Sequence, residues 1–319
     1  MKNGFVNGHF YSVSQFYREK FGSKVYKIAI DAGCTCPNRD GTKGFGGCVF
    51  CSESGSGEFA ADRFLSVSEQ IKNAKNLVSK KIKNGKYIAY FQNHSNTYGN
   101  EDSLFQKYIE ASSACDVVGL DIATRPDCVF PSMLEKISNL SKKTFVTMEL
   151  GLQTSNEKTA DYIKRLYTNE EYLDCVRRIK AASADIHIVT HLIFGLPFET
   201  EADMLESVDF CINALTDGIK ISVLHVLKGT EILNAFRNGE FSTLEMDEYF
   251  RILGKALVRI PENVVIHRLT GDGAKKLLVS PMWTADKKNV LNSLASYLRK
   301  NEIVQGKDFQ YNFLHETTL

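Results

Sequence analysis

The sequence predicts an α/β fold, in which a partial (βα)6 barrel of the TIM-like type is followed by a mainly helical C-terminal extension. Three observations lead to this prediction. Strand-like and helix-like segments alternate through six successive units, which is the pattern of a parallel sheet. A cysteine-rich loop and several polar clusters directly follow strands, where parallel barrels build their active sites. With 43% hydrophobic and 24% charged residues, the 319-residue chain can bury a sizeable core.

The first strand covers residues 24–31, because polar and apolar side chains alternate there and several are β-branched. A helix is expected over residues 66–85, which open with capping residues, carry apolar side chains at helical spacing and end at Gly85. Residues 86–92 form a second, buried strand. The same signals predict strands at 117–123, 144–151, 186–194 and 218–227, and helices at 101–113, from 131, at 155–166, at 169–182 and at 200–215.

After Gly229 the pattern changes. Helices are expected at 231–238 and 244–260, a short strand at 264–268 and a last helix at 285–300. We therefore divide the chain into an N-terminal segment (1–23), a partial barrel (24–229) and a C-terminal extension packed on the barrel (230–319). An open barrel leaves one side accessible to a large substrate.

Three cysteines share one glycine-rich loop after the first strand: Cys36, Cys48 and Cys51, spaced C-x11-C-x2-C. An iron–sulfur cluster normally takes four cysteines, so a protein that supplies three leaves one iron open to a substrate or cofactor. The alternative is structural zinc, because Cys34 brings the local number of thiols to four. Zinc knuckles usually have two CxxC pairs, however, and this loop has one.

The remaining cysteines are not expected to be cluster ligands. Cys115, Cys175 and Cys211 fall within apolar helical or strand-edge patterns, which is typical of buried free thiols. Cys128 follows a strand end, so a redox or substrate role is the alternative there.

Several motifs resemble, in order, those of one known family. They are Thr35-Cys36-Pro37-Asn38-Arg39-Asp40-Gly41, Gly46-Gly47-Cys48-Val49-Phe50-Cys51, Ala123-Thr124-Arg125-Pro126-Asp127, Glu149-Leu150-Gly151-Leu152-Gln153-Thr154, His191-Leu192-Ile193-Phe194-Gly195-Leu196-Pro197, Leu227-Lys228-Gly229-Thr230 and Leu269-Thr270-Gly271-Asp272-Gly273. Over nearly its whole length the chain resembles the radical SAM proteins of the YhcC/YtqA type, which are relatives of the radical SAM domain of the Elongator catalytic subunit.

This resemblance implies that Cys36, Cys48 and Cys51 hold a [4Fe–4S] cluster, and it favours the cluster over zinc. Cys34 is not a ligand in that family. The resemblance also implies S-adenosylmethionine as a cofactor, cleaved reductively to a 5′-deoxyadenosyl radical that abstracts hydrogen from the substrate. The electron would come from a donor of the flavodoxin or ferredoxin type.

Polar groups at strand ends are needed to hold this cofactor. Asn96 and Thr97, after the second strand, are candidates to contact the methionine amine. By the family pattern Gln153, at the end of the fourth strand, would face the cofactor, and Arg165 would pair with the methionine carboxylate, which suits a guanidinium fork. The alternatives are that Asn96 and Thr97 cap the following helix and that Arg165 is a solvated helix arginine.

By the same resemblance Ile193 and Gly195 lie where related enzymes pass the backbone beside adenine. Glu149, inside an apolar strand, either contacts ribose or substrate or pairs with a buried base for structural reasons. His191 is either a site residue or a core histidine satisfied by hydrogen bonds. One position departs from the Elongator-type motif, which has Glu where this chain has Ala123.

For the substrate, the resemblance implies tRNA. Related enzymes are linked to wobble-uridine modification, in which carboxymethylaminomethyl-uridine becomes aminomethyl-uridine. Lysine clusters at 80–83, 142–143, 275–276 and 287–288 and the aromatic residues Tyr90, Tyr98 and Trp283 give weak independent support, and residues 275–283 are a candidate wall of the site. Ordinary solvated lysines explain the clusters as well, and 39 basic against 38 acidic side chains is not the excess of a dedicated nucleic-acid binder.

Two other functional classes stay open: a radical SAM enzyme acting on a small metabolite or peptide, and a non-enzymatic iron–sulfur or zinc scaffold. No secretory segment is recognisable at the start of the sequence, and no apolar run reaches membrane-spanning length. We therefore expect a cytoplasmic protein without a membrane partner.

Overall fold

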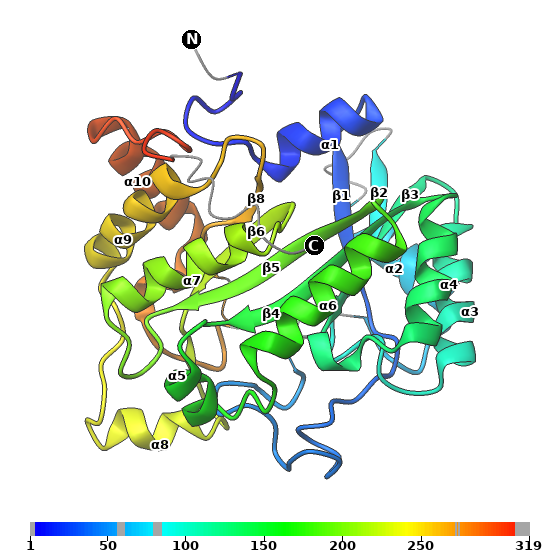
Figure 1. The fold of residues 1–319 in the computed structure, drawn as a ribbon, viewed down its shortest axis with the longest axis horizontal. Coiled ribbons are helices and arrows are strands. Elements are labelled where there is room, and N and C mark those ends of the chain that lie inside the picture. The colour runs from blue at the N-terminus through cyan, green and yellow to red at the C-terminus, as the bar shows by residue number, and fades with distance from the viewer. Residues whose placement is uncertain (1–3, 56–60, 79–84, 272, 274, 310–319) are drawn as a thin grey trace, which may run out of the picture.

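A parallel sheet of seven strands curls into a half-barrel at the centre of the molecule (Figure 1). The computed structural model describes residues 4–55, 61–78, 85–271, 273 and 275–309. The strand order is β1-β2-β3-β4-β5-β6-β8, with every neighbouring pair parallel. The strands are β1 (Val25–Ile30), β2 (Lys86–Phe91), β3 (Val117–Thr124), β4 (Phe145–Gln153), β5 (Ile186–Phe194), β6 (Gly218–Val223) and β8 (Val265–Arg268).

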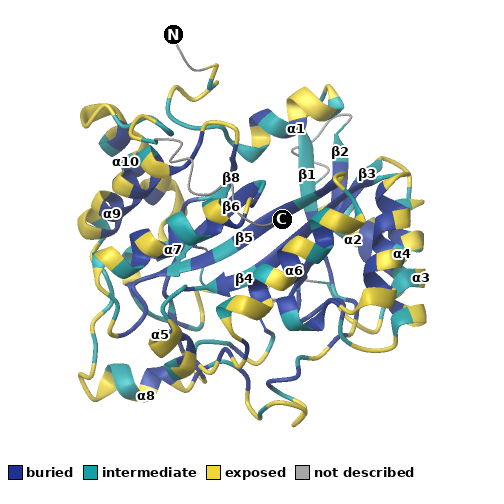
Figure 2. Ribbon diagram, viewed as in Figure 1, coloured by how far each residue is buried: buried dark blue, intermediate teal, exposed yellow. Residues whose placement is uncertain are grey.

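Helices cover the outer face of this sheet, because parallel neighbours are joined by crossovers that return through a helix. Figure 2 shows their buried sides toward the strands and their exposed sides outward. The expected helix at 66–85 runs partly into residues 79–84, which lie outside the described residues. The barrel helices are α2 (Val67–Val78), α3 (Glu101–Ser112), α4 (Pro131–Ser141), α5 (Glu157–Tyr162), α6 (Asn169–Ala182) and α7 (Glu201–Asn213).

The C-terminal region contributes to the barrel itself. Its strand β8 pairs with β6 so that Arg268 lies opposite Lys220, and this adds a seventh strand to the predicted six. The predicted strand at 218–227 is divided, because its last part forms β7 (Val226–Leu227), which pairs antiparallel with β9 (Leu278–Ser280). The helices of this region are α8 (Ile232–Arg237), α9 (Met246–Arg259) and α10 (Lys287–Lys300).

The N-terminal segment contains a helix that the sequence analysis does not predict, α1 (Val13–Phe21). Ser12 caps its start, and Gly22 ends it in the left-handed conformation, with φ at 67°. Phe16 stacks on His187 of β5 with ring centroids 4.9 Å apart. In Figure 1, α1 lies at the opposite end of the barrel from the loop that carries the cysteines, so it covers the amino ends of the strands.

None of the helices in the described ranges is both long enough and apolar enough to cross a lipid bilayer.

Candidate active site

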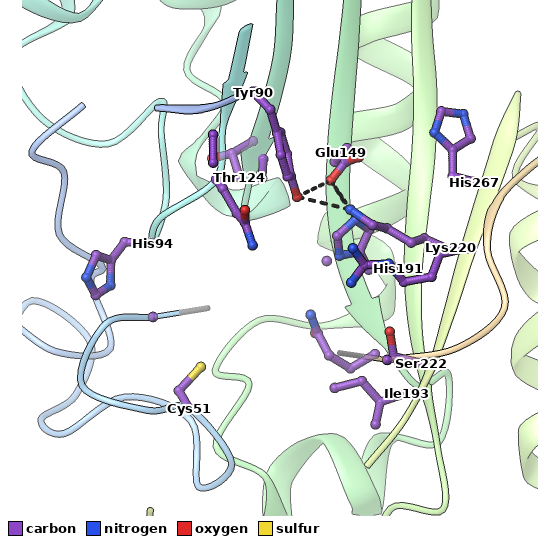
Figure 3. A pocket seen from close by; sticks show the side chains of 18 of the residues that line it. Cys51, Tyr90, His94, Thr124, Glu149, His191, Ile193, Lys220, Ser222 and His267 are labelled. Carbon is purple, nitrogen blue, oxygen red and sulfur yellow. Dashed lines mark hydrogen bonds and ion pairs between the residues drawn. The ribbon is translucent and has the colours of Figure 1, made fainter. Parts of the chain in front are cut away.

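A cavity of about 800 Å³ occupies the inside of the half-barrel. It is lined by the inward faces of the strands, by the cysteine loop and by residues of the C-terminal region. Figure 3 shows Cys51 and His94 on one side of this space and Lys220 and His191 on the other. The cavity therefore has a thiol end, at Cys36, Cys48 and Cys51, and a polar floor, at Tyr90, Glu149, His191 and Lys220.

Cys36, Cys48 and Cys51 all line the cavity as free, half-exposed thiols. The backbone N–H of Cys51 donates to the carbonyl of Cys48 at 2.9 Å, so a tight turn brings these two side chains together. Gly47 has a φ of 92°, and a Cβ there would lie 3.0 Å from the guanidinium of Arg39. The loop thus needs glycine at this position for its backbone to pass close to the thiols.

The environment of Cys48 favours its thiolate, whereas the hydrogen bond to Cys48 raises the pKa of Cys51. A hydrogen bond from Cys51 lowers the pKa of Cys48 to about 7, against the effect of burial, and the charges of Arg125 and Arg39 act in the same direction. Asn38 Nδ2 also lies 3.5 Å from Cys48 Sγ. Thiolates are the form that binds metals and clusters, so the loop is suited to hold one.

The donor set fits a cluster better than a single zinc ion. Cys34, the fourth thiol that zinc would need, is buried in the apolar core and does not line the cavity. Burial raises the pKa of its thiol to about 12. Within the described ranges, no three side chains of His, Cys, Asp or Glu converge as they would around one metal ion. Three thiols from one loop that lines the cavity are the number that a [4Fe–4S] cluster with one open iron takes from the protein.

The other cysteines take no part in the cavity. Cys128, Cys175 and Cys211 are buried, and burial raises the pKa of the Cys128 thiol to about 12. Cys115 is exposed, so the expectation that it is buried is wrong. It lies between α3 and β3, where the chain turns at the surface.

Asn96 and Thr97 are not brought to the cavity. Both are fully buried, and neither lines it. The amide of Asn96 donates to the carbonyls of Phe91 and Ala123 at 2.9 and 2.8 Å, so it links the ends of β2 and β3. The hydroxyl of Thr97 is within 2.7 Å of both Thr124 Oγ1 and the Cys128 carbonyl. These bonds hold the two side chains inside the protein, so the structure does not bring them to the place where a methionine amine would bind.

The alternative, that Asn96 and Thr97 cap the next helix, is also wrong, because Asn100 caps α3. Ser95 and His94, from the same loop, line the cavity instead.

Arg165 is a structural residue. Its side chain is 1% exposed, which excludes a solvated helix arginine. A guanidinium has five N–H donors, and all five of Arg165 have acceptors within the protein. They are the carbonyls of Tyr167 (2.8 Å), Leu152 (3.2 Å) and Thr154 (2.7 Å) and the side chains of Glu157 (3.1 Å) and Asn169 (3.0 Å). Arg165 lines the cavity, but in this structure all of its donors are engaged within the protein, so the pairing with a methionine carboxylate stays a prediction.

Of the other three predicted cofactor contacts, two line the cavity and one does not. Gln153 lines the cavity at the end of β4 with a φ of 65°, and its side-chain oxygen accepts from the Tyr167 hydroxyl at 3.0 Å. Ile193 also lines the cavity, as Figure 3 shows. Gly195 does not, because its missing Cβ faces Leu244, which it would approach to 2.9 Å. Gln153 and Ile193 therefore lie in the cavity as predicted, and Gly195 does not line it.

The floor of the cavity is a buried ionic network centred on Glu149 (Figure 3). Glu149 Oε2 lies 2.7 Å from Lys220 Nζ, 2.6 Å from the Tyr90 hydroxyl and 2.8 Å from His191 Nε2. Its other oxygen lies 2.9 Å from Lys27 Nζ. Burial acts to raise the pKa of Glu149, but Lys220, Lys27 and His191 hold it well below its usual value. Glu149 is thus ionised and pairs with buried bases, which was one of its two expected roles.

Burial and the charges around Glu149 also shift the pKa values of the neighbouring side chains. Burial lowers the pKa of Lys220 to about 8 and that of His191 to about 4. Burial and the charge of Glu149 raise the pKa of Asp121, which also pairs with Lys27, to about 7. His191 is therefore neutral and contacts Glu149 while it lines the cavity.

Sequence reasoning missed Lys27, Asp121, Lys220 and Arg268. A signal was present, because Lys27, Asp121 and Lys220 each stand alone among apolar neighbours inside a strand. Since side chains alternate along a strand, such a residue lies on one defined face, but only the curled sheet shows that this face lines a cavity.

The C-terminal candidates are placed differently from the prediction. Residues 275–283 do not line the cavity, whereas His267, Arg268, Gly271 and Gly273 do. Trp283 donates through Nε1 to the Leu244 carbonyl at 3.0 Å and packs on the ring of Tyr249 at 5.6 Å, so it is a core residue and not a platform for a base.

The lysine pairs 142–143, 275–276 and 287–288 include exposed residues away from the cavity, and the cluster at 80–83 lies outside the described residues.

Comparison with known proteins agrees with this architecture. The profile of the Radical SAM superfamily matches residues 36–211, and that of the Radical_SAM C-terminal domain matches residues 216–300. The chain is 39% identical over 301 residues to the protein YtqA of Bacillus subtilis, covering 94% of this chain and 93% of that protein.

Two more distant likenesses add to this. The chain is 25% identical over 147 residues to a tRNA-2-methylthio-N(6)-dimethylallyladenosine synthase of Thermotoga petrophila, covering 45% of this chain and 33% of that protein. Among solved structures, the archaeal Methanocaldococcus infernus Elp3 superposes with a TM-score of 0.67 at 17% identity, over 89% of this chain and 64% of that one, which is a likeness of fold.

Proposed function

Because this chain belongs to the radical SAM superfamily, we propose that it is a radical enzyme acting on tRNA, which converts wobble carboxymethylaminomethyl-uridine to aminomethyl-uridine. The superfamily uses a [4Fe–4S] cluster and S-adenosylmethionine. Bound together, they supply a 5′-deoxyadenosyl radical that abstracts hydrogen from the substrate. Cys36, Cys48 and Cys51 would hold the cluster, and Gln153 and Ile193 are the candidates to contact S-adenosylmethionine.

In overall balance the carbon between the amine and the carboxylate is oxidised by two electrons: one of its hydrogens goes to the 5′-deoxyadenosyl group, and the amine loses a proton. Water then adds across the resulting C=N bond, and the carboxymethyl carbons leave as glyoxylate. S-adenosylmethionine is the oxidant and ends as methionine and 5′-deoxyadenosine, so no further oxidant is needed.

The observation that carries this proposal is the charge of the cavity. Among the described residues that line it, six are lysine or arginine and one, Glu149, is acidic. Asp121, Asp127 and Glu157, which do not line the cavity, pair with Lys27, Arg125 and Arg165. The positive charge that remains still favours an anionic substrate group inside the half-barrel, although the whole chain has a formal net charge of only +1. The partial likeness to a tRNA-modifying synthase supports tRNA as the source of that group.

The first test is anaerobic. The purified protein is reconstituted, iron and sulfide are counted, and 5′-deoxyadenosine is measured after dithionite and S-adenosylmethionine are added. The wild type should form 5′-deoxyadenosine, and a variant with Cys36→Ala, Cys48→Ala and Cys51→Ala should not. A colourless protein that binds zinc and forms no product would contradict the radical reaction.

The second test concerns the substrate. Purified tRNA carrying carboxymethylaminomethyl-uridine is incubated with the active protein, and its nucleosides are separated and identified by mass. Aminomethyl-uridine should appear only with wild-type protein and S-adenosylmethionine. If 5′-deoxyadenosine forms while the nucleoside stays unchanged, the radical activity stands and the tRNA assignment fails.

A small metabolite or peptide is the second candidate substrate. The cavity volume of about 800 Å³ lies in the range of small-molecule sites, and the near-neutral chain favours no polyanion. Retention of tRNA through purification, lost at high salt, would argue against this alternative.

A further inference from the structure

We propose that Arg268 binds the carboxylate of the substrate's carboxymethylaminomethyl group, so that the cavity floor selects this modified uridine from uridines without a carboxylate. The inference rests on the proposed function, because it names the part of that substrate which Arg268 contacts. Three observations support it: where Arg268 lies, that most neighbouring cations already have acceptors within the protein, and that a guanidinium matches a carboxylate.

Arg268 is placed at the cavity floor by the strand that the C-terminal region adds to the sheet. It is the last residue of β8, lies opposite Lys220 of β6 and lines the cavity. The pKa values of Lys220 and His191 agree with this position. After burial, which is the main cause, the charge of Arg268 contributes to the lowered pKa of Lys220 and of His191. Arg268 is thus close to both residues.

The other cations of the cavity floor already have acceptors. Lys27 pairs with Asp121 and Glu149. Lys220 lies 2.7 Å from Glu149 and 3.0 Å from the Tyr90 hydroxyl.

Two of the three arginines at the thiol end are occupied in the same way. Arg125 forms two hydrogen bonds with Asp127, at 2.9 and 2.8 Å, and a third with the Arg165 carbonyl. All five donors of Arg165 are occupied. Arg39 donates through Nη2 to the carbonyls of Ser52 and Cys51. It forms no ion pair in the described ranges, but it lies in the cysteine loop, at the end of the cavity away from Lys220.

Arg268 differs from all of these. Within the described part of the chain, no hydrogen bond or ion pair is formed by its guanidinium. No acidic side chain other than Glu149 lines the cavity in those residues, and both oxygens of Glu149 are engaged by other groups. A half-buried cation without an acid partner favours an anionic ligand, and a guanidinium matches a carboxylate through two parallel hydrogen bonds.

The anion is assigned to the base substituent and not to a tRNA phosphate because of where Arg268 lies. It belongs to the sheet, level with Lys220, whose side chain is only 8% exposed. A splayed-out base can enter a pocket of this kind with its substituent leading, whereas phosphates stay on the strand outside. The proposed reaction then removes the carboxylate from the nucleoside, which weakens the hold on the product and favours its release.

The test compares two anticodon stem-loop RNAs that differ only at the wobble uridine, one with carboxymethylaminomethyl and one with methylaminomethyl. Their dissociation constants are measured for wild type, Arg268→Met, Arg268→Lys and the control Arg18→Met, which removes an exposed arginine of α1. Thermal unfolding shows whether each variant is folded. The wild type and the control should bind the carboxylate RNA roughly 10- to 100-fold more tightly, as expected for a charge-assisted pair of hydrogen bonds.

Arg268→Met should remove this preference and leave the affinity for the methylaminomethyl RNA within about twofold of wild type. Arg268→Lys should restore part of the preference, because a lysine keeps the charge but not the fork. Equal loss of affinity for both RNAs in Arg268→Met would overturn the proposal, since it would show a phosphate contact or a structural role. A preference that survives in Arg268→Met would overturn it as well.

The result also separates this inference from the proposed function. A wild-type protein that converts the RNA but shows no preference for the carboxylate refutes the role of Arg268 alone. A wild-type protein that shows the Arg268-dependent preference but forms no aminomethyl-uridine refutes the proposed reaction and supports the binding site.

Discussion

At the scale of single residues, Glu149 holds the floor of the cavity together. Its carboxylate is fully buried and is shared by two lysines, a tyrosine and a histidine. A buried ion pair contributes little net stability relative to an apolar pair, but removal of one partner leaves a charge without compensation. Loss of the Glu149 carboxylate should therefore lower the free energy of unfolding more than loss of an exposed acid.

We expect Glu149→Gln to lower the free energy of unfolding by about 3 kcal/mol, because Lys27 and Lys220 lose their shared counter-charge. Urea denaturation at pH 7 measures this value. The matched control is Glu170→Gln on α6, where an exposed pair with Arg177 should contribute less than about 0.5 kcal/mol. Equal effects of the two substitutions would contradict the central role of Glu149.

Arginines of the cavity also show why residue type alone does not identify a ligand contact. Arg165 and Arg268 both line it, yet the first is saturated by acceptors from its own chain and the second has none in the described residues. The two arginines are distinguished only by how many of their N–H donors already have an acceptor within the protein.

At the scale of elements, α1 closes the amino end of the barrel through a histidine pair. His187 Nε2 lies 3.0 Å from His267 Nε2, and Phe16 of α1 stacks on His187. Burial lowers the pKa of His187 to about 4 and holds that of His267 well below its usual value. Both rings are therefore neutral at pH 7 and can pack under the helix.

The sign of the pH effect follows from these pKa values. Because the folded-state pKa of His187 is lower than its unfolded value, the unfolded chain binds the proton more readily. The contribution of His187 to stability is present above about pH 6.5 and is lost as the pH falls towards about 4.

We predict that His187→Gln reduces the acid loss of stability. Between pH 6.5 and pH 4.5 the free energy of unfolding of the variant should fall by about 2 kcal/mol less than that of the wild type. Urea titrations at several pH values measure both curves, which should run parallel above pH 7. Parallel curves over the whole range would show that His187 does not titrate on unfolding.

At the scale of the whole molecule, a nearly neutral chain lines its cavity with more basic than acidic side chains. The formal net charge is +1, while six lysine or arginine residues and one acid line the cavity among the described residues. This distribution favours recognition of one anionic group in a pocket over broad contact with a nucleic-acid backbone.

The proposed function therefore predicts a shallow salt dependence of tRNA binding. A plot of log binding constant against log salt concentration should have a slope of about −2, as expected for two or three phosphate contacts on a single strand. Filter binding or fluorescence anisotropy between 50 and 200 mM salt would measure it. A slope steeper than about −5 would instead indicate an extended basic surface.

The sequence by itself determined most of the strands and helices of the barrel, but not α1, and it indicated the three cysteines as candidate cluster ligands. Both are local properties: hydrophobic period and turn residues set the elements, and Cys36, Cys48 and Cys51 lie within 16 consecutive residues. The superfamily was confirmed on the same basis, since its motifs are short and ordered along the chain.

Only the tertiary structure decided which polar side chains reach the cavity. Asn96 and Arg165 stand in sequence positions that suggest ligand contacts, but their donors are taken by carbonyls that folding brings beside them. Conversely, Lys27, Glu149 and Lys220 come from β1, β4 and β6 and meet because the sheet curls. Such contacts depend on side-chain direction and distant pairing, which no local sequence pattern contains.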